Sequence, residues 1–363
     1  MQRLLCIVSS LNAGGAETFM MKVLRNLPDG YKIDFVTSAS SGVYEKEVLE
    51  LGGKIHRVPL RTKHPLRTFL CIRNVVAQNG YHCVLKLCDT PIGVFDLLAA
   101  KAGGAKKLCA RSCNASSNEG TIRKIVNTVL RPLFNRITSV KIAPSRLAAE
   151  YTFGKKEVEN RKVFFLNNGL DLSLFQYSEI ARKNIRQELQ IPDDVTVYGH
   201  IGRFNQQKNH DFLIEVFEKI HQQENDTVFV LVGIGELMQQ IKEKVHQKGL
   251  DGSVKFLGLR SDIPAILSAM DVFVFPSFYE GMPNTVIEAQ ATGLPCVIAD
   301  TITREANITG LVEYLPLGDA EHWAASAKQA MRTVRPDTHK MFYEQHYDIA
   351  SQTKTFIEYM FEE

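Results

Sequence analysis

The sequence predicts an α/β fold made of two successive units, each a parallel β-sheet covered by helices. Short apolar, β-branched runs alternate with longer amphipathic segments, which is the pattern of strands joined by crossover helices. The same alternation restarts after residue 165. A chain of 363 residues is also longer than one typical domain of roughly 100 to 200 residues. We therefore expect two Rossmann-like domains.

The expected elements divide the chain into an N-terminal domain, residues 1–167, a second domain, 168–337, and a helical tail, 338–363. The first domain is expected to have strands at residues 4–9, 33–37, 84–87, 142–144 and 163–166, and helices at 17–26, 44–51, 66–78, 95–101 and 122–135. The second is expected to have strands at 195–201, 228–232, 254–256, 272–275 and 296–299, and helices at 211–221, 236–248, 263–269 and 285–292. The join falls in the turn-forming run Asn167-Asn168-Gly169, and the tail is expected to pack across both domains.

Composition excludes several classes of protein. With 45% hydrophobic and 23% charged residues the chain is typical of a globular protein. No run of about 18 apolar residues occurs, and the first ten residues read as a strand rather than a signal peptide, so a cytoplasmic location is expected. The seven cysteines include no C-x-x-C pair, which argues against structural zinc and for free thiols.

The net charge of +3 conceals a strongly basic first half. Residues 1–165 hold 26 of the 43 Lys and Arg but only 12 of the 40 Asp and Glu. Such a half attracts nucleic acid, an anionic membrane or an acidic substrate. No nucleic-acid module is recognisable, which favours a peripheral contact with an anionic membrane, although an ordinary solvated basic face remains an equal alternative. Candidate contacts are Arg57, Arg61, Lys63, Arg67, Arg73, Arg123, Lys124, Arg131 and Arg136, the last group beside Ile125, Val129 and Phe134.

The most informative segment, residues 276–289, follows an expected buried strand and opens a helix. Free backbone N–H groups at a helix start form a ready site for a diphosphate. The candidate donor-binding residues here are Gly281, Met282, Asn284, Thr285 and Val286, with Asn284 also expected to cap the helix. Glu280 and Glu288 flank this position and are expected to bind hydroxyl groups on either side of it; the alternative is that they only favour the helix start electrostatically.

A second segment, residues 199–210, places Gly202, Arg203 and Lys208 after a strand of the second domain. Open α/β sheets bind ligands at the carboxyl ends of their strands, and two cations there suit a diphosphate leaving group. Arg203 offers a bidentate fork and Lys208 a point charge. As isolated cations both would more often be surface residues, but their spacing favours a functional role.

Three glycine-containing turns carry weaker signals. In the first domain, Gly14 and Gly15 join the first strand to a helix, which lets the backbone approach a ligand. This turn lacks both the G-x-G-x-x-G and the G-x-x-x-x-G-K-[ST] patterns, which argues against a dehydrogenase and a P-loop kinase. In the second domain, Gly233 lies in a strand-to-helix turn, and Leu259 follows the next expected strand. These two positions are candidates for donor contacts or for scaffolding.

The run P-S-x-x-E-G-x-P-x-x-x-x-E-A at 276–289 strongly resembles the retaining glycosyltransferases of family 4, whose GT-B fold has two Rossmann-like domains facing across a cleft, with a C-terminal helix crossing back. The resemblance covers the whole chain and is closest to capsular and exopolysaccharide enzymes. It implies that Glu280 holds the donor sugar and Glu288 the ribose. It also implies that Arg203 and Lys208 clamp the pyrophosphate, and that the loop with Gly14, Gly15, Ala16 and Glu17 lies near donor phosphate and acceptor.

The chain departs from the family pattern at 110–114. Members often carry A-H-S-H-N there, with a histidine that contacts the donor sugar, whereas this sequence has Ala-Arg-Ser-Cys-Asn. Arg111 and Asn114 are therefore candidates for the sugar or acceptor side, and catalysis by an imidazole at this place is excluded. His200 is interpreted as a satisfied histidine rather than a base.

These observations predict a retaining, metal-independent hexosyltransferase without a cofactor, acting on a UDP-sugar and a saccharide acceptor, which is expected to be lipid-linked, in surface polysaccharide synthesis. No D-x-D metal motif is present. Two alternatives stay open: a nucleotide-sugar epimerase on the same fold, which would need no acceptor, and a binding protein without turnover. Retention of Arg203, Lys208 and Glu280 argues against the second.

Overall fold

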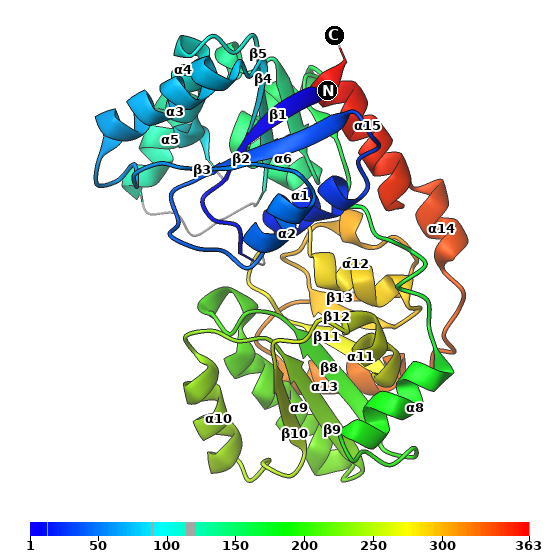
Figure 1. The fold of residues 1–363 in the computed structure, drawn as a ribbon. Coiled ribbons are helices and arrows are strands. Elements are labelled where there is room, and N and C mark those ends of the chain that lie inside the picture. The colour runs from blue at the N-terminus through cyan, green and yellow to red at the C-terminus, as the bar shows by residue number, and fades with distance from the viewer. Residues whose placement is uncertain (13, 89, 114–120, 363) are drawn as a thin grey trace. The chain divides into compact units, whose positions relative to one another are not determined.

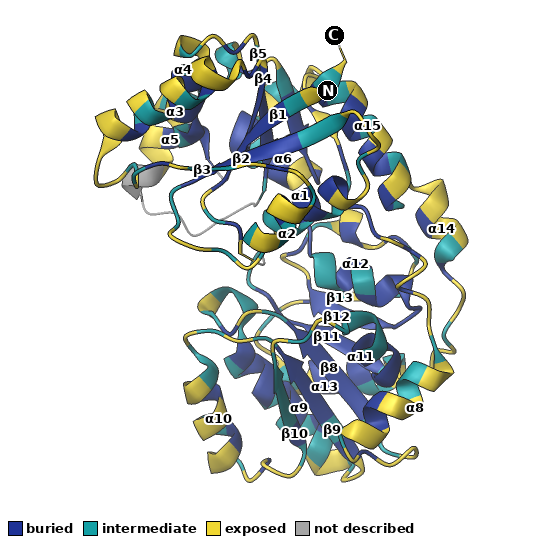
Figure 2. Ribbon diagram, in the orientation of Figure 1, coloured by how far each residue is buried: buried dark blue, intermediate teal, exposed yellow. Residues whose placement is uncertain are grey.

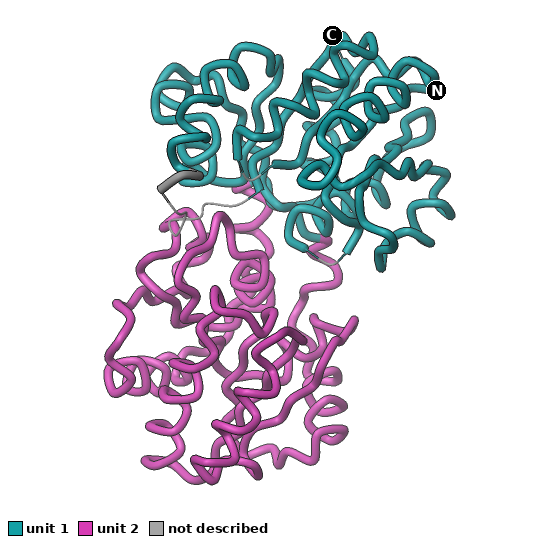
Figure 3. Tube along the Cα trace, turned by 90° about the vertical axis from the view of Figure 1, so that its left-hand side faces the viewer, with its two compact units in different colours: residues 1–170, 346–363 teal, residues 171–345 magenta. Residues whose placement is uncertain are grey.

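The structure is a computed structural model that describes residues 1–12, 14–88, 90–113 and 121–362. The chain forms two compact units. Unit 1 consists of Met1–Leu170 together with His346–Glu363, and unit 2 is Asp171–Gln345 (Figure 3). Within the described residues no helix is both long and apolar enough to cross a lipid bilayer.

Within the described part of unit 1, seven strands form one parallel sheet in the order β3-β2-β1-β4-β5-β6-β7 (Figure 1). The strands are β1 (Gln2–Ile7), β2 (Tyr31–Thr37), β3 (Ile55–Arg57), β4 (Cys83–Cys88), β5 (Lys107–Ser112), β6 (Val140–Ala143) and β7 (Phe164–Phe165). The helices are α1 (Gly15–Arg25), α2 (Glu45–Glu50), α3 (Pro65–Asn79), α4 (Val94–Ala102), α5 (Thr121–Ile137), α6 (Arg146–Phe153), α7 (Lys155–Glu159) and α15 (Ile349–Phe361), with a 3-10 turn at Pro91–Gly93.

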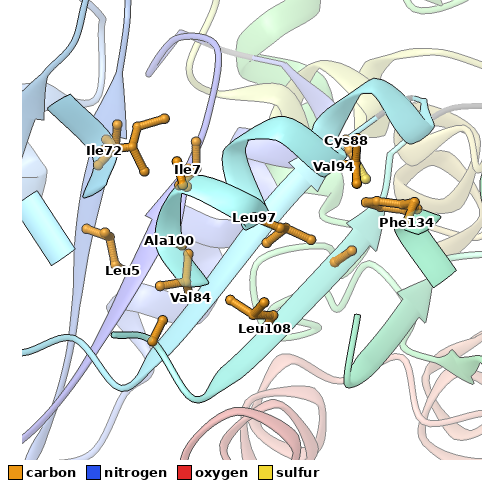
Figure 4. Packing of buried hydrophobic residues seen from close by; sticks show 14 of the residues in the cluster. Leu5, Ile7, Ile72, Val84, Cys88, Val94, Leu97, Ala100, Leu108 and Phe134 are labelled. Carbon is orange, nitrogen blue, oxygen red and sulfur yellow. The ribbon is translucent and has the colours of Figure 1, made fainter. Parts of the chain in front are cut away.

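Both faces of this sheet are apolar because successive side chains of a strand point to opposite sides. On one side Leu5 and Val84 belong to a cluster of buried residues that includes Leu97 of α4 and Phe134 of α5 (Figure 4). Leu4 belongs to a second cluster of buried residues, formed with side chains of α1 and α15. Figure 2 shows the buried strands between helices that are partly exposed.

The C-terminal helix α15 completes the second face. The rings of Phe19 in α1 and Phe356 in α15 meet edge to face, with centroids 6.4 Å apart. Leu170 accepts a hydrogen bond from the Ile349 amide at 2.8 Å and donates to the Tyr347 carbonyl at 2.7 Å. Unit 1 is therefore closed by residues from both ends of the sequence, while α14 (His339–Glu344) belongs to unit 2.

In the described part of unit 2, six strands form a parallel sheet in the order β10-β9-β8-β11-β12-β13. The strands are β8 (Thr196–Ile201), β9 (Thr227–Val232), β10 (Val254–Gly258), β11 (Val272–Phe275), β12 (Cys296–Ala299) and β13 (Val312–Leu315). The helices are α8 (Glu179–Glu188), α9 (His210–Gln223), α10 (Met238–Gln247), α11 (Ile263–Ala269), α12 (Asn284–Ala291), α13 (Ala320–Ala330) and α14, with 3-10 turns at Gln206–Lys208 and Arg304–Ala306. The predicted pair of Rossmann-like α/β domains is thus confirmed.

Strand order fixes where ligands can bind. Each sheet runs outward in one direction and then reverses, between β1 and β4 in unit 1 and between β8 and β11 in unit 2. Open α/β sheets bind ligands at such a switch point, beyond the carboxyl ends of the strands. The glycine loop that precedes α1 follows β1, and the predicted phosphate-side segments follow β8 and β11.

Candidate functional site

In unit 2 the loop after β8 and the segment after β11 bring together two of the three predicted catalytic residues. Lys208 Nζ lies 2.6 Å from Glu280 Oε1, and these side chains are only 17% and 10% exposed. The ammonium also lies 4.5 Å from the centroid of the Phe275 ring. The carboxylate and the aromatic face together hold the Lys208 side chain in place.

Arg203 stands at the start of the same loop with its side chain exposed. Among the described residues this side chain has no hydrogen-bond or ion-pair partner. An unpaired, solvated guanidinium beyond the end of a parallel strand is available to a diphosphate, which it can contact through two parallel N–H groups.

The helix start after Glu280 differs in two details from the expectation. Pro283 occupies the N-cap position of α12, and Asn284 is the first helical residue, so Asn284 does not cap the helix. The Val286 N–H donates to the Pro283 carbonyl at 3.1 Å, so this amide is not free as predicted. In the described chain the Met282 and Thr285 amides have no acceptor, which leaves two N–H groups for an anion.

Glu288 lies one turn into α12, four residues after Asn284, and both are half-buried. Residues four apart share one face of a helix. Buried Gly281 and Met282 precede this face, while Glu280 comes from the loop before the helix. The two carboxylates therefore belong to separate elements, as the sequence predicted, and Glu280 is the one that bonds to Lys208 among the described contacts.

Two glycines let the strand ends of β8 and β9 approach closely. Gly233 has a positive φ of 134°, and a Cβ on it would overlap the carbonyl oxygen of Gly202. A Cβ on Gly202 would in turn lie 2.7 Å from His200 Nε2 and 3.2 Å from Lys208 Cδ. Neither position accommodates a side chain, so glycine at both positions lets the two strand ends and the Lys208 side chain pack closely. Leu259, after β10, is 69% exposed.

Two histidines are buried directly behind this loop. His200 Nδ1–H donates to the Val274 carbonyl at 2.9 Å, so it is hydrogen-bonded as expected. The His210 ring stacks on Phe204 with centroids 4.1 Å apart. Within the described structure His200 Nε2 and both His210 nitrogens have no hydrogen-bond partner. Burial, helped by the nearby Lys208 cation, lowers the pKa of His210 from 6.5 to about 4, and burial lowers the pKa of His200 well below its usual value.

These buried histidines predict a pH-dependent stability. Both are neutral when folded but titrate near pH 6.5 when unfolded, so between about pH 6.5 and 4 the unfolded chain binds more protons. We expect the free energy of unfolding to fall over this window as pH decreases, with a contribution of about 3 kcal/mol from His210. Denaturation at several pH values should show a weaker dependence in His210→Phe, whereas exposed His322→Gln should behave like the unaltered protein. Identical slopes for His210→Phe and the unaltered chain would contradict this assignment.

In unit 1 the loop after β1 leads directly into α1. Gly14 is the N-cap residue of this helix, and Gly15 and Ala16 form its first turn. The Glu17 carboxylate folds back over Gly14, where a Cβ would overlap its Oε2. Because Gly14 has no side chain, the Glu17 carboxylate can lie against the start of α1. The negative charge of this carboxylate stabilises the helix start electrostatically.

Arg111 is enclosed within unit 1. Its guanidinium lies 4.0 Å from the Phe19 ring centroid and donates to Asn168 Oδ1, and the residue is 1% exposed. Burial lowers the pKa of this guanidinium. Asn114, the other residue predicted for the sugar or acceptor side, lies outside the described residues.

The structure corrects part of the predicted basic face on α5. Phe134 is buried and stacks on Phe153, and Arg131 donates to the Tyr151 carbonyl at 3.0 Å. Both side chains therefore pack within unit 1, whereas Pro132 and Leu133 between them are exposed. Elsewhere Arg57 pairs with Glu45, and Arg61 with Asp96. The Arg123 side chain lies outside the described residues.

The sequence reasoning overlooked Phe275, Gln207 and Asn209, which border the Lys208–Glu280 pair. A signal for Asn209 existed, since asparagine is one of the few residues that tolerate a left-handed backbone, which Asn209 adopts. Among the described residues, no group of three or more His, Cys, Asp or Glu is arranged to hold a metal ion.

The family model described as "Glycosyl transferases group 1" matches residues 195–333. The chain is 34% identical to the "Putative glycosyltransferase EpsF" of Bacillus subtilis (strain 168), over 92% of this chain and 89% of that protein. It is 33% identical to the Escherichia coli "UDP-Gal:alpha-D-GlcNAc-diphosphoundecaprenol alpha-1,3-galactosyltransferase", over 65% of this chain and 62% of the relative. The crystal structure of Anabaena Alr3699/HepE in complex with UDP and glucose is similar with a TM-score of 0.79, at 20% identity and 99% coverage of both chains.

Proposed function

Because this chain belongs to the glycosyl transferases group 1 family, we propose that it transfers the sugar of a UDP-sugar to a saccharide acceptor, releasing UDP, during synthesis of a surface polysaccharide. The observation that supports this most directly is the paired Lys208 and Glu280 beside the exposed Arg203, at the switch point of the unit 2 sheet. Relatives named for capsular polysaccharide and for a diphosphoundecaprenol-linked acceptor support the class of product and a lipid-linked acceptor.

In the proposed reaction Arg203 and Lys208 bind the donor diphosphate, assisted by the Met282 and Thr285 amides, while Glu280 and Glu288 bind sugar and ribose hydroxyls. The acceptor oxygen bonds to the anomeric carbon on the face from which the diphosphate leaves. The bond between that carbon and the phosphate oxygen breaks, and the acceptor proton passes to the leaving phosphate. Cations at the developing charge lower the barrier, and configuration is retained without a protein base.

The test uses the full chain with a panel of nucleotide sugars. A donor at 100 times its dissociation constant should raise stability by ~2.7 kcal/mol, which a thermal shift detects. That donor is then incubated with and without saccharide acceptors, and the anomeric configuration of the product is read by NMR. Transfer with retention supports the proposal. A donor sugar epimerised without acceptor, donor binding without turnover, or an inverted product would each contradict it.

Metal removal should leave the transfer rate unchanged. The proposal assigns the leaving charge to Arg203, Lys208 and two amides, which need no divalent ion. Initial rates in EDTA and in Mg²⁺ are expected to agree within a factor of two. Activity lost in EDTA and restored by Mg²⁺ would contradict metal independence.

A peripheral membrane contact through unit 1, at the cytoplasmic face, completes the proposal. Helix α5 exposes both apolar and basic residues. Ile125 is 57% and Val129 70% exposed. Lys124 and Arg136 on the same helix are exposed as well. On α3, Leu66 and Leu70 are exposed with Arg67 and Arg73. Amphipathic basic surfaces of this kind bind anionic lipid.

We expect vesicles containing anionic lipid to bind the protein, and binding to weaken as salt increases. The variant Ile125→Asn/Val129→Asn should weaken binding further, because it removes the apolar part of the surface. Ile180→Asn, at an equally exposed apolar position in unit 2, is the matched control and should bind normally. Absence of vesicle binding by the unaltered protein, or equal loss in both variants, would exclude this surface.

A further inference from the structure

Three consecutive residues of the β8–α9 loop each bond to the segment that follows β11. The Gln207 side-chain N–H donates to the Tyr279 carbonyl at 2.8 Å, Lys208 pairs with Glu280, and the Asn209 side-chain N–H donates to the Pro276 carbonyl at 3.2 Å. In the reverse direction the Phe278 amide donates to the Gln207 carbonyl at 2.9 Å. The two segments are 72 residues apart in the sequence at Lys208 and Glu280 but are fastened together at four points.

These bonds act on the backbone that presents Glu280. The Tyr279 carbonyl belongs to the peptide group that joins Tyr279 to Glu280, so the Gln207 bond fixes the plane of that peptide. The Pro276 carbonyl, bonded to Asn209, fixes the start of the same segment where β11 ends. These bonds therefore restrain the backbone from which the Glu280 side chain reaches Lys208.

The backbone of Asn209 contributes on the lysine side. Asn209 has φ 54° and ψ 48°, in the left-handed region, and it separates the 3-10 turn Gln206–Lys208 from helix α9. Asparagine tolerates this conformation better than most residues, and here its side chain also makes the bond to Pro276. Asn205 caps the other end of the turn, where its Oδ1 accepts a hydrogen bond from the Lys208 N–H at 3.2 Å.

We propose that Gln207 and Asn209 are positioning residues, which align Lys208 and Glu280 for the donor diphosphate and sugar. This inference rests on the proposed function. Neither side chain is part of the apolar core, since both residues are only half-buried. Each side-chain amide donates a hydrogen bond to a backbone carbonyl of the 276–279 segment. Their contribution is thus geometric: a misplacement of about 1 Å at a reacting group costs on the order of 100-fold in rate.

The experiment uses the full chain and the variants Gln207→Met, which keeps length without an N–H donor, and Asn209→Gly, which keeps the left-handed backbone. Gln206→Met is the matched control, because Gln206 is exposed and its side chain has no bond within the described residues. Melting temperature, UDP affinity by calorimetry, and kcat and KM for the donor are measured. We expect the two variants to bind UDP about 10-fold more weakly and to lose 10- to 100-fold in kcat, at melting temperatures close to that of Gln206→Met.

Coupling to Glu280 separates positioning from general destabilisation. If Gln207 acts through Glu280, Gln207→Met should lower kcat less than threefold in a Glu280→Gln background, since the contact it aligns is already lost. Equal losses in both backgrounds, or wild-type kcat and UDP affinity for both variants, would overturn the inference. If one of the two variants has a clearly lowered melting temperature, the kcat and UDP affinity of the other variant decide the inference. If neither the unaltered chain nor Gln206→Met transfers sugar, the proposed function is wrong, but the UDP affinities of the variants still test the positioning role. If the unaltered chain does not bind UDP, both the proposed function and the positioning role are wrong.

Discussion

Replacing Lys208 with alanine is expected to lower turnover about 100-fold or more, the cost of removing one group that stabilises the leaving charge. The ammonium lies 2.6 Å from Glu280 Oε1, in the segment that leads into α12, where it can meet the charge that develops on the leaving diphosphate. The measurement is the initial rate of sugar transfer at saturating donor. Lys183→Ala, at a 64% exposed lysine in α8, is the control and should be fully active.

Stability distinguishes the two roles of Lys208. Its loss also leaves Glu280, 8% exposed, without a counter-ion, which destabilises the folded state. The double variant Lys208→Ala/Glu280→Gln should therefore recover melting temperature without recovering turnover. Arg203→Ala should lower turnover similarly at unchanged stability, since exposed Arg203 leaves no described partner behind. Rates equal to that of the control in both single variants would exclude the proposed diphosphate contacts.

The second large effect is expected for Gly233→Ala, at about 3 kcal/mol or more of lost stability. The added methyl group would overlap the Gly202 carbonyl oxygen, which is backbone and cannot move aside as a flexible side chain would. The site should fail as well, because a shift of the Gly202 backbone would press on the Lys208 side chain, whose Cδ would lie only 3.2 Å from a Cβ placed on Gly202. Chemical denaturation and UDP affinity measure the two consequences.

Two other glycines provide graded controls. Gly258 has φ 64° and nothing within 4 Å of an added Cβ, so Gly258→Ala reports the backbone cost alone, about 1 kcal/mol. Gly252 has neither a positive φ nor a close neighbour, so Gly252→Ala should change stability by less than about 0.5 kcal/mol. If Gly233→Ala is no more harmful than Gly258→Ala, the close approach of the β8 and β9 ends is not essential.

The fold was predictable because most strands are apolar runs between amphipathic segments. Three strands that the sequence did not indicate contain charged residues. The edge strands β3 and β13 are short and include Arg57 and Glu313, since one edge of each is unpaired and tolerates charge. Strand β5 is internal but ends in Arg111, which only the buried contacts with Phe19 and Asn168 make compatible with a core.

The candidate site was predictable as a set of segments and not as a set of contacts. Spacing and position after a strand pointed to Arg203, Lys208 and Glu280, but a pair 72 residues apart in sequence requires the sheet to bring it together. The N-cap prediction for Asn284 was wrong because Pro283 already takes that position, which local preference alone does not decide. Gln207 and Asn209 were missed because their role depends on carbonyls of another segment.

The interrupted course of unit 1 determines the order in which the protein can mature on the ribosome. Residues 171–345 are continuous and have every strand of their sheet before synthesis reaches α15. Unit 1 must wait, because the cluster containing Leu4, Phe19 and Phe35 stays incompletely covered until Phe356 and Met360 emerge. The nascent chain therefore exposes part of an apolar surface during most of translation. A premature stop just before residue 346 would leave that surface exposed and prone to aggregation.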